Sequence, residues 1–428
     1  MTAEIAIINR GAIALAADSK VTLSHGGKQK TYDTVNKLFA LSKTEPVGAM
    51  IYGNAEFVGF PWETIVKEYR RRRPNTKFDT IIDVAADFKS FLVDFFPFTT
   101  DDEDRTALTI AHSWFQRVVD QSFQQSASME DFNTNLLEAL QTYLVELERA
   151  EAFLSDEEWK TIEARIGAAL LSLCSSGPLH DLKDRQVELY RLLTLGITKK
   201  LASPATSGIV IAGFGDRELL PSLVSHDIDG ILCGRIKAIE TNNIDITRKS
   251  NGVIIPFAQT DMVYRFMEGI DPEYATLVRE SLNQLLIDNA INTASALGID
   301  GERLAVLLEA FNVAAGESVD TFWAAHERHR RERYVSPIIE MVSSLPKDEL
   351  ANLAESLVSL TSLQRRVSRE IETVGGAVDV AVISKGDGFV WVKRKHYFPP
   401  DRNLRYINSY FMDCVNPNNA GGQNADDA

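Results

Sequence analysis

The sequence predicts an α+β protein in which two long helical blocks interrupt a strand-rich frame. Short apolar runs of strand length, closed by turn residues, occupy about 1–57, 207–258 and 374–396. Apolar residues at helical spacing fill about 58–203 and 260–371. No Pro-, Gly- or Ser-rich linker divides the chain, so we expect a single domain over 1–414. The Asn-, Gly- and Asp-rich end, 415–428, is typical of a disordered tail.

The strands are predicted from short runs rich in Ile, Val, Ala and Leu. Two such runs flank Asn9-Arg10-Gly11, which has the composition of a tight hairpin turn. A further strand over 47–51 ends at Gly53-Asn54. The later runs predict strands at 208–215 and 252–256, with a turn into another strand over 227–232, and a last hairpin over 378–383 and 389–393.

The helices are predicted from apolar residues three and four positions apart. This spacing indicates helices over 81–95, 132–147, 159–173, 274–296, 302–313, 321–343 and 350–371. Ser155 and Glu158 form a capping-box pattern, and Ser176-Gly177-Pro178 breaks the helix that follows. Pro61 opens an earlier helix that ends in arginines 70–73, which we expect to be a solvated helix end.

The composition is typical of a soluble globular protein, with 45% hydrophobic and 25% charged residues. The net charge of −15 argues against a nucleic-acid-binding surface. Cys174, Cys233 and Cys414 are too far apart for a disulfide framework or a zinc site. The sequence shows neither a signal-peptide pattern nor an 18-residue apolar run, so we expect a cytoplasmic protein that does not bind membranes.

Two motifs could carry chemistry but have simpler interpretations. Gly213-x-Gly215 lacks the third glycine or the Lys-Ser/Thr of a phosphate loop, so a strand end is favoured. His326 and His329 share a helix face, but arginines surround them and no third ligand is evident. We therefore expect a solvated polar face there, no metal site and no cofactor.

The start of the chain carries a more specific set of groups. Initiator methionine is normally removed before a residue as small as threonine, so we expect Thr2 to bear a free α-amine. A threonine hydroxyl needs a nearby base, and an N-terminal threonine has one in that amine. An ammonium such as Lys37 would lower both pKa values, and a carboxylate such as Asp18 would orient the lysine. The alternative is a processed first residue, a turn carboxylate and a solvated charge.

The same stretch resembles the start of proteasome β-type subunits, in the N-terminal nucleophile (Ntn) hydrolase superfamily. Matches are the threonine start, Ala16-Ala17-Asp18-Ser19-Lys20-Val21-Thr22, Lys37-Leu38-Phe39, and the Gly53-Asn54-Ala55-Glu56 turn. Gly375-Gly376 and the hairpin after it resemble the family's last hairpin. The resemblance covers residues 1–60 and 374–396 and, more weakly, 207–270, as in a divergent bacterial-type member with large helical insertions.

The resemblance implies a fold and a mechanism. The fold is a four-layer αββα sandwich, here with enlarged helical layers. The activity is that of a threonine peptidase, in which the Thr2 hydroxyl attacks an amide carbonyl and its α-amine transfers the proton. Lys37 would tune the pKa values, Asp18 would orient Lys37, and the backbone N–H aligned at Met50 would stabilise the oxyanion.

The resemblance also implies a pocket and partners. Lys20, Val21, Gly48 and Tyr52 align with residues around a substrate pocket. The expected partners are a peptide or protein substrate, further copies of the chain in a homo-oligomer such as a ring, and a separate unfoldase.

Some positions depart from the family pattern. Ile371 and Val374 replace an Asp-x-x-Ser pair, and Ala258-Gln259-Thr260 lacks the family's central serine. Met50 stands where the family has glycine. These departures leave open a second hypothesis, a non-catalytic assembly or regulatory protein that uses its helical blocks for docking.

Overall fold

The computed structural model describes residues 3–25, 28–124, 126, 128–176, 183–247, 252–299, 301–368, 374–396, 398–399 and 402–404. Thr2, Ile371 and the expected tail at 415–428 lie outside these residues. Within the described chain, no helix is both long enough and apolar enough to cross a membrane.

Two five-stranded antiparallel sheets form the centre of the molecule. The first sheet has the order β12 (Gly252–Ala258), β1 (Ala3–Asn9), β2 (Ile13–Ala17), β13 (Asp379–Ser384), β14 (Gly388–Lys393). The second has the order β11 (Arg235–Asp245), β10 (Ser222–Leu232), β9 (Ser207–Gly213), β6 (Val47–Gly53), β5 (Leu38–Ala40). Two small hairpins complete the strands: β3 (Val21–His25) with β4 (Lys28–Tyr32), and β7 (Glu56–Phe57) with β8 (Phe60–Pro61).

The helices fall into the two predicted blocks. The first block contains α1 (Trp62–Arg72), α2 (Ile81–Asp94), α3 (Thr100–Gln124), α4 (Met129–Arg149), α5 (Asp156–Cys174) and α6 (Lys183–Thr198). The second contains α7 (Asp261–Glu268), α8 (Pro272–Ala296), α9 (Gly301–Arg330), the π-helical turn η2 (Arg331–Val335), α10 (Ser336–Ser344) and α11 (Lys347–Val367). The prediction of a mixed α and β fold is therefore confirmed.

Alternating side chains of β1 contribute to two separate apolar clusters. Ala6 and Ile8 pack between the two sheets, whereas Ile5 and Ile7 pack against α7, α10 and α11. A third cluster fills the space between the second sheet and helices α1 and α2. Each sheet thus buries one face against the other sheet and the opposite face against helices.

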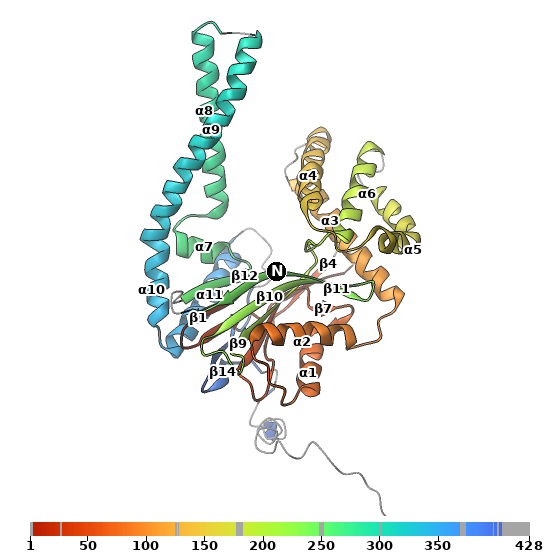
Figure 1. Ribbon diagram of the computed structural model, residues 1–428, viewed down its shortest axis with the longest axis vertical. Helices are drawn as coiled ribbons and strands as arrows, with labels where there is room; N and C mark the ends of the chain where they lie inside the picture. The colour runs from red at the N-terminus through yellow and green to blue at the C-terminus, as the bar shows by residue number, and fades with distance from the viewer. Residues whose placement is uncertain are drawn as a thin grey trace, which may run out of the picture.

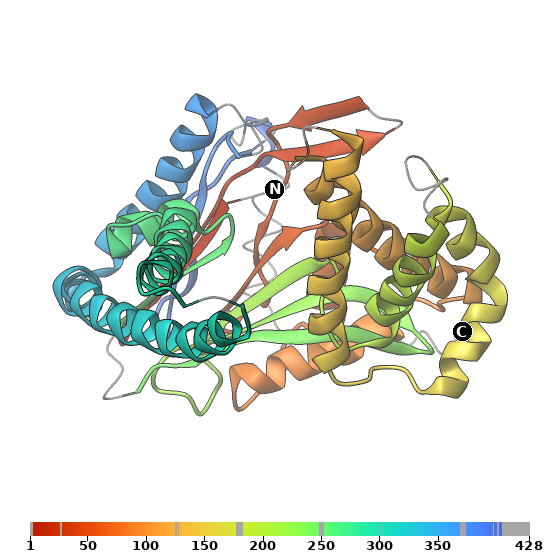
Figure 2. The same ribbon diagram turned by 90° about the horizontal axis from the view of Figure 1, so that it is seen from above.

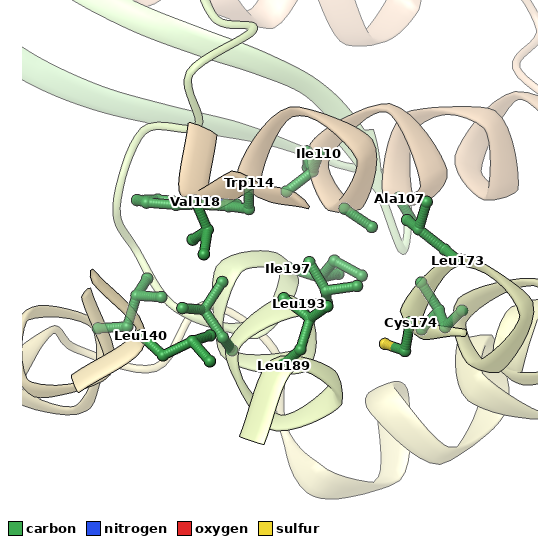
Figure 3. Close-up of a cluster of buried hydrophobic side chains, with 14 of the residues drawn as sticks. Ala107, Ile110, Trp114, Val118, Leu140, Leu173, Cys174, Leu189, Leu193 and Ile197 are labelled. Carbon is green, nitrogen blue, oxygen red and sulfur yellow. The ribbon is translucent and has the colours of Figure 1, made fainter. Parts of the chain in front are cut away.

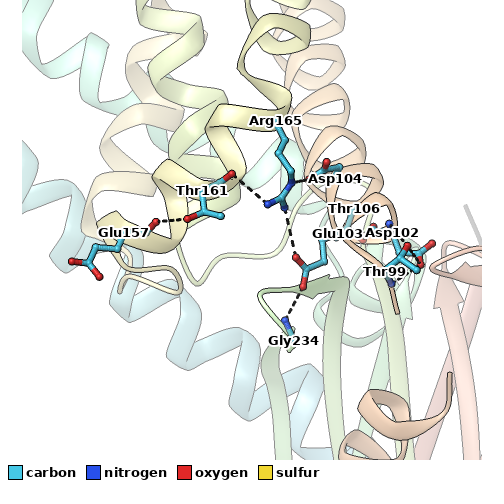
Figure 4. Close-up of polar contacts among 9 residues, drawn as sticks. All are labelled: Thr99, Asp102, Glu103, Asp104, Thr106, Glu157, Thr161, Arg165 and Gly234. Atoms are coloured by element: carbon cyan, nitrogen blue, oxygen red, sulfur yellow. Dashed lines mark hydrogen bonds and ion pairs between the residues drawn. The ribbon is translucent and has the colours of Figure 1, made fainter. Parts of the chain in front are cut away.

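Helices α3–α6 form a subassembly with a core of their own. Trp114 of α3, Leu140 of α4, Leu173 of α5 and Leu193 of α6 point toward one another (Figure 3). Polar contacts then attach this subassembly to the second sheet, as Figure 4 shows. Arg165 of α5 binds Asp104 and Glu103 of α3, and Glu103 accepts from the Gly234 N–H in the β10–β11 turn at 2.8 Å.

Helices α8 and α9 form a long antiparallel hairpin that rises at the left of Figure 1, apart from α3–α6 at the right, and Figure 2 shows it from above. The hairpin has little core, since α8 buries only Ala275, Ala290 and Ala294, and α9 only Ala315 and Val319. Large apolar side chains remain exposed along it: Tyr274, Leu277, Leu285, Val306, Leu307, Val313 and Phe322.

Several local predictions are confirmed. The Asn9-Arg10-Gly11 hairpin forms, because the Asn9 side chain accepts from the Gly11 and Ala12 N–H groups. Ser155 and Glu158 form the predicted capping box of α5. Thr80 and Asp83 form a second one at α2 that the sequence analysis missed.

Other local predictions are wrong. Asp227 lies inside β10 and not in a turn, and the partner strand β11 was not predicted. Polar residues interrupt the apolar positions of β11, at Arg235, at Lys237 and over 240–243, so it lacks a continuous apolar run. The break expected between 313 and 321 is also absent: α9 runs through Gly316, where a Cβ would meet nothing within 4 Å.

Candidate functional site

Asp18 is the centre of the candidate site. It directly follows β2 and its side chain is fully buried. Its carboxylate accepts hydrogen bonds from the backbone N–H groups of Ala3 (3.1 Å), Lys20 (3.3 Å) and Gly375 (3.0 Å). The carboxylate therefore joins the start of β1, the end of β2 and the segment before β13, so it holds the first described residue in place.

Lys37 completes the charge balance of Asp18. Its ammonium lies 2.5 Å from the Asp18 Oδ1, and its side chain is only 4% exposed. Within the described part of the chain, Asp18 is the one hydrogen-bond partner of this ammonium. The structure thus brings together Asp18 and Lys37, two of the four residues of the predicted catalytic set. Thr2 lies outside the described residues, but it is bonded to Ala3, whose N–H contacts Asp18.

A pocket of about 330 Å³ adjoins Lys37. The loop before β5, the end of β6 and the start of α1 form its walls. Its apolar lining is Val21, Val35, Ile51, Ala55, Pro61 and Trp62, and its polar lining includes Asn36, Glu56 and Glu63 as well as Lys37. A partly open, mostly apolar pocket with a few polar groups is typical of a small-molecule or side-chain binding site.

The Glu63 carboxyl gives this pocket a fixed negative charge. Burial would raise the pKa of Glu63, but hydrogen bonds from Lys67 and Asn36 and the charge of Lys67 outweigh burial and lower it. Glu56 lies nearby and is exposed. Sequence reasoning missed both carboxylates, because Glu56 was assigned only to a turn and Glu63 only to a helix start.

Of the four predicted pocket residues, Val21 lines this pocket and the others lie elsewhere. Gly48 faces the other sheet, since a Cβ there would lie 2.8 Å from the Ile383 Cδ1 and the Phe389 ring. Tyr52 also lies between the sheets, where it stacks on Phe257 and its hydroxyl donates to Asp227 at 2.8 Å. Burial, together with the Asp227 charge, raises the pKa of Tyr52.

Lys20 is buried beside the pair rather than in the pocket. Its backbone N–H donates to Asp18, and its ammonium lies 3.9 Å from the Asp33 carboxylate.

Met50 does not occupy the position expected of an oxyanion donor. Its side chain is fully buried between the sheets. The next residue, Ile51, donates its N–H to the Lys37 carbonyl at 2.9 Å on the β5 side. Neighbouring residues of a strand direct their N–H groups to opposite sides, so the Met50 N–H points toward β9, where Val210 lies opposite. The sheet uses this donor, which corrects the expected role of Met50.

The departures from the family pattern have structural explanations where they are described. Val374 is fully buried in the cluster beneath α11, which explains an apolar residue at that position. Ala258 adopts a left-handed backbone (φ 62°) directly opposite Ala3 at the end of β12. Non-glycine residues rarely hold this conformation, and such strain concentrates near functional sites.

The structure also explains the two weaker motifs, Gly213-x-Gly215 and the His326–His329 pair. A Cβ at Gly213 would lie 2.0 Å from the Pro46 carbonyl oxygen, and one at Gly215 2.2 Å from the Asp79 carbonyl oxygen. Close backbone packing therefore accounts for both glycines. His326 and His329 are exposed on α9, and the described residues contain no group of three or more His, Cys, Asp or Glu side chains placed to hold a metal ion.

Comparisons with known proteins give distant structural likenesses. No model of a protein family matches the chain, and no curated protein matches it. The chain is similar to the solved structure of Anbu (ancestral beta-subunit) from Yersinia bercovieri, with 11% identity over 99% of this chain and 100% of that one, at a TM-score of 0.28. It is similar to the Anbu (Gly-1) mutant from Hyphomicrobium sp. strain MC1, with 11% identity over 100% of both chains, at a TM-score of 0.27. At these TM-scores the site must be judged by its own geometry.

Proposed function

We propose that this protein is an Ntn-type threonine hydrolase that cleaves amide bonds of peptides by acyl transfer from Thr2. The observation that carries the proposal is the buried Lys37 ammonium. Asp18 holds it beside a 330 Å³ pocket, and the same carboxylate binds the N–H of the residue bonded to Thr2. A buried cation beside a pocket and an N-terminal hydroxyl is the arrangement that activates such a nucleophile.

In this mechanism the chain begins at Thr2 after removal of Met1. The Thr2 hydroxyl attacks the substrate carbonyl, and its α-amine accepts the hydroxyl proton and passes it to the leaving amine. Water then attacks the ester with the amine again as base, which releases the acid product and restores Thr2. Lys37 favours the neutral amine by charge repulsion, and Asp18 fixes the position of Lys37. Met50 has no role, because its N–H is directed at β9.

The fold supports the same proposal. The chain forms four layers with an apolar cluster between each neighbouring two. In order, the layers are helices α1 and α2, the second sheet, the first sheet, and helices α7, α10 and α11. We propose that this is the αββα sandwich of the Ntn hydrolases, with α3–α6 and the α8–α9 hairpin as elaborations. A homo-oligomer, such as a ring, and a separate unfoldase remain part of the proposal.

Covalent labelling tests the proposal directly. A peptide epoxyketone requires both a hydroxyl and a free α-amine on one residue, so intact-mass analysis should show one adduct that maps to Thr2. The matched controls are Thr2→Ala and a chain with extra residues before Thr2, which retains the hydroxyl but blocks the amine. Absence of an adduct on a chain whose N-terminus is shown to be Thr2 would refute the mechanism.

A non-catalytic assembly protein is the second candidate. The exposed apolar side chains of the α8–α9 hairpin favour it, because a two-helix projection with so little core is suited to docking. N-terminal sequencing of untagged protein separates the two: retained Met1 leaves Thr2 without an α-amine and favours docking.

A further inference from the structure

A second group of reactive side chains lies where α2 covers the second sheet, apart from Asp18 and Lys37 of the proposed active site. Helix α2 crosses this sheet, with contacts to β9, β10 and β11 (Figure 1). Lys89 of α2 places its Nζ 2.9 Å from the Nε2 of His226 on β10. The His226 ring is buried, whereas Lys89 is partly exposed. The structure therefore places the amine of a partly exposed lysine against a buried imidazole.

We propose that Lys89 is a preferred site of acylation by small activated acyl donors, of the acyl phosphate or thioester class. The neutral amine attacks the acyl carbon, and the bond from that carbon to the phosphate oxygen or thiolate sulfur breaks. The leaving group departs with the electron pair, and the proton lost from nitrogen passes to His226 and then to water. The product is a neutral amide, and no oxidant or further reactant is needed.

The charges around Lys89 favour its neutral form. Burial lowers the pKa of Lys89, and the nearby Lys200 ammonium lowers it further, whereas the charge of Glu240 on β11 acts in the opposite direction. Only a neutral amine is nucleophilic, and each unit of pKa decrease raises the neutral fraction at pH 7 about tenfold. Partial burial thus makes this lysine more reactive than its exposure alone would indicate.

His226 is suited to accept the released proton. Burial, followed by the charge of Lys89, lowers the pKa of His226 to about 4, although the Glu240 carboxylate 3.9 Å from Nε2 opposes this. The ring is therefore neutral at pH 7 before the reaction. The amine that attacks is already neutral, so the second cause of the lowered pKa is absent in the reacting form. The imidazole is therefore a better base beside the reacting amine than beside the resting ammonium.

Acylation would be compatible with the fold. The amide N–H of an acylated lysine still donates a hydrogen bond, so the contact with His226 need not be lost. Repulsion between Lys89 and Lys200 would also disappear. The modification would therefore accumulate on folded protein.

The test uses acetyl phosphate at pH 7.5 with the folded full-length protein, and peptide mass spectrometry to measure the acetylation rate of each lysine. Lys67 and Lys77 are internal references, because both are more than half exposed and each pairs with a carboxylate. We expect Lys89 to react about threefold or more faster than either reference. A rate equal to or below theirs overturns the proposal.

Two surface variants sharpen this test because their predicted effects have opposite signs. Glu240→Gln removes the charge that favours the ammonium and should speed acetylation of Lys89, whereas Lys200→Gln should slow it. Glu240 and Lys200 are each about half exposed, so both variants should fold. Unchanged rates in both variants, with the reference lysines also unchanged, would contradict the proposed electrostatic activation.

Discussion

Among the residues that the structure describes, two lysine–aspartate pairs are buried on both sides, and their surroundings differ. Lys37 and Asp18 lie 2.5 Å apart at one edge of the sheets, and Lys237 and Asp229 lie 3.1 Å apart between β10 and β11. All four side chains are nearly or fully inaccessible to solvent. The residue types and their burial are thus the same, so neither can distinguish a functional pair from a structural one.

The difference lies in what else each lysine contacts. Lys237 also donates to the Gly196 carbonyl at the end of α6, and Asp229 accepts from the backbone and hydroxyl of Ser203. This pair is sealed beneath the α3–α6 subassembly and ties it to the sheet. Lys37 instead lines a pocket, and the carboxylate of its partner Asp18 binds the Ala3 N–H. Access to a pocket, rather than burial, marks the pair proposed to act in catalysis.

The largest expected effect distinguishes the two lysines by activity. Lys37→Arg should lower kcat/KM by about 10² to 10⁴, because a planar guanidinium cannot replace a compact ammonium beside the nucleophile. Lys237→Arg should leave the activity per folded molecule unchanged, although overpacking lowers its stability. Peptide hydrolysis and Tm measured together on both variants give the answer. Near-normal turnover by Lys37→Arg would end the proposed mechanism.

The next effect distinguishes the aspartates by stability. Asp229→Asn leaves Lys237 buried without a negative partner, which should reduce the free energy of unfolding by about 3–5 kcal/mol. Urea denaturation measures this loss. Asp18→Asn should also destabilise the fold, because three backbone N–H groups share that carboxylate, but only this variant should lose activity in its folded fraction. Equal activity losses in both would remove the distinction between the pairs.

His226 differs from the two buried lysines, because it is buried as a neutral group. Its folded-state pKa of about 4 lies below the value of about 6.5 for an unfolded chain. The unfolded chain therefore binds a proton first as pH falls, and this residue's contribution lowers the free energy of unfolding from about pH 6.5 down to about pH 4. His226→Gln should flatten this part of the stability profile, measured by urea denaturation at several pH values. Parallel profiles for the two proteins would contradict the neutral assignment.

The smallest effect is expected for a pair at the surface. Lys393 binds Glu355 at 2.5 Å, but its side chain is 54% exposed. Solvent screens such a pair, so Lys393→Ala should change the free energy of unfolding by no more than about 1 kcal/mol. Urea denaturation of Lys393→Ala and Asp229→Asn under the same conditions compares the two losses in the free energy of unfolding directly. A loss as large as that of Asp229→Asn would show that burial does not determine how strongly Lys237–Asp229 and Lys393–Glu355 stabilise the fold.

Local patterns predicted many of the elements. The Asn9 turn, the Ser155–Glu158 capping box and the last hairpin all depend on residues within a few positions of each other. Strand β11 escaped prediction because polar residues interrupt its apolar positions; pairing with β10 makes it a strand. Likewise, separate helices were expected over 302–313 and 321–343, but α9 is continuous through Gly316 and packs on α8.

The sequence by itself placed Asp18 and Lys37 in one candidate site, because the stretch that contains them resembles the start of proteasome β-type subunits. Only the tertiary structure decided the surroundings of that site. It brought Gly375, 357 positions away, to the Asp18 carboxylate, directed the Met50 N–H into the sheet, and turned Tyr52 away from the pocket. The physical reason is that capping and strand alternation act between near neighbours, whereas desolvation and hydrogen-bond direction depend on whichever distant segments cover a residue.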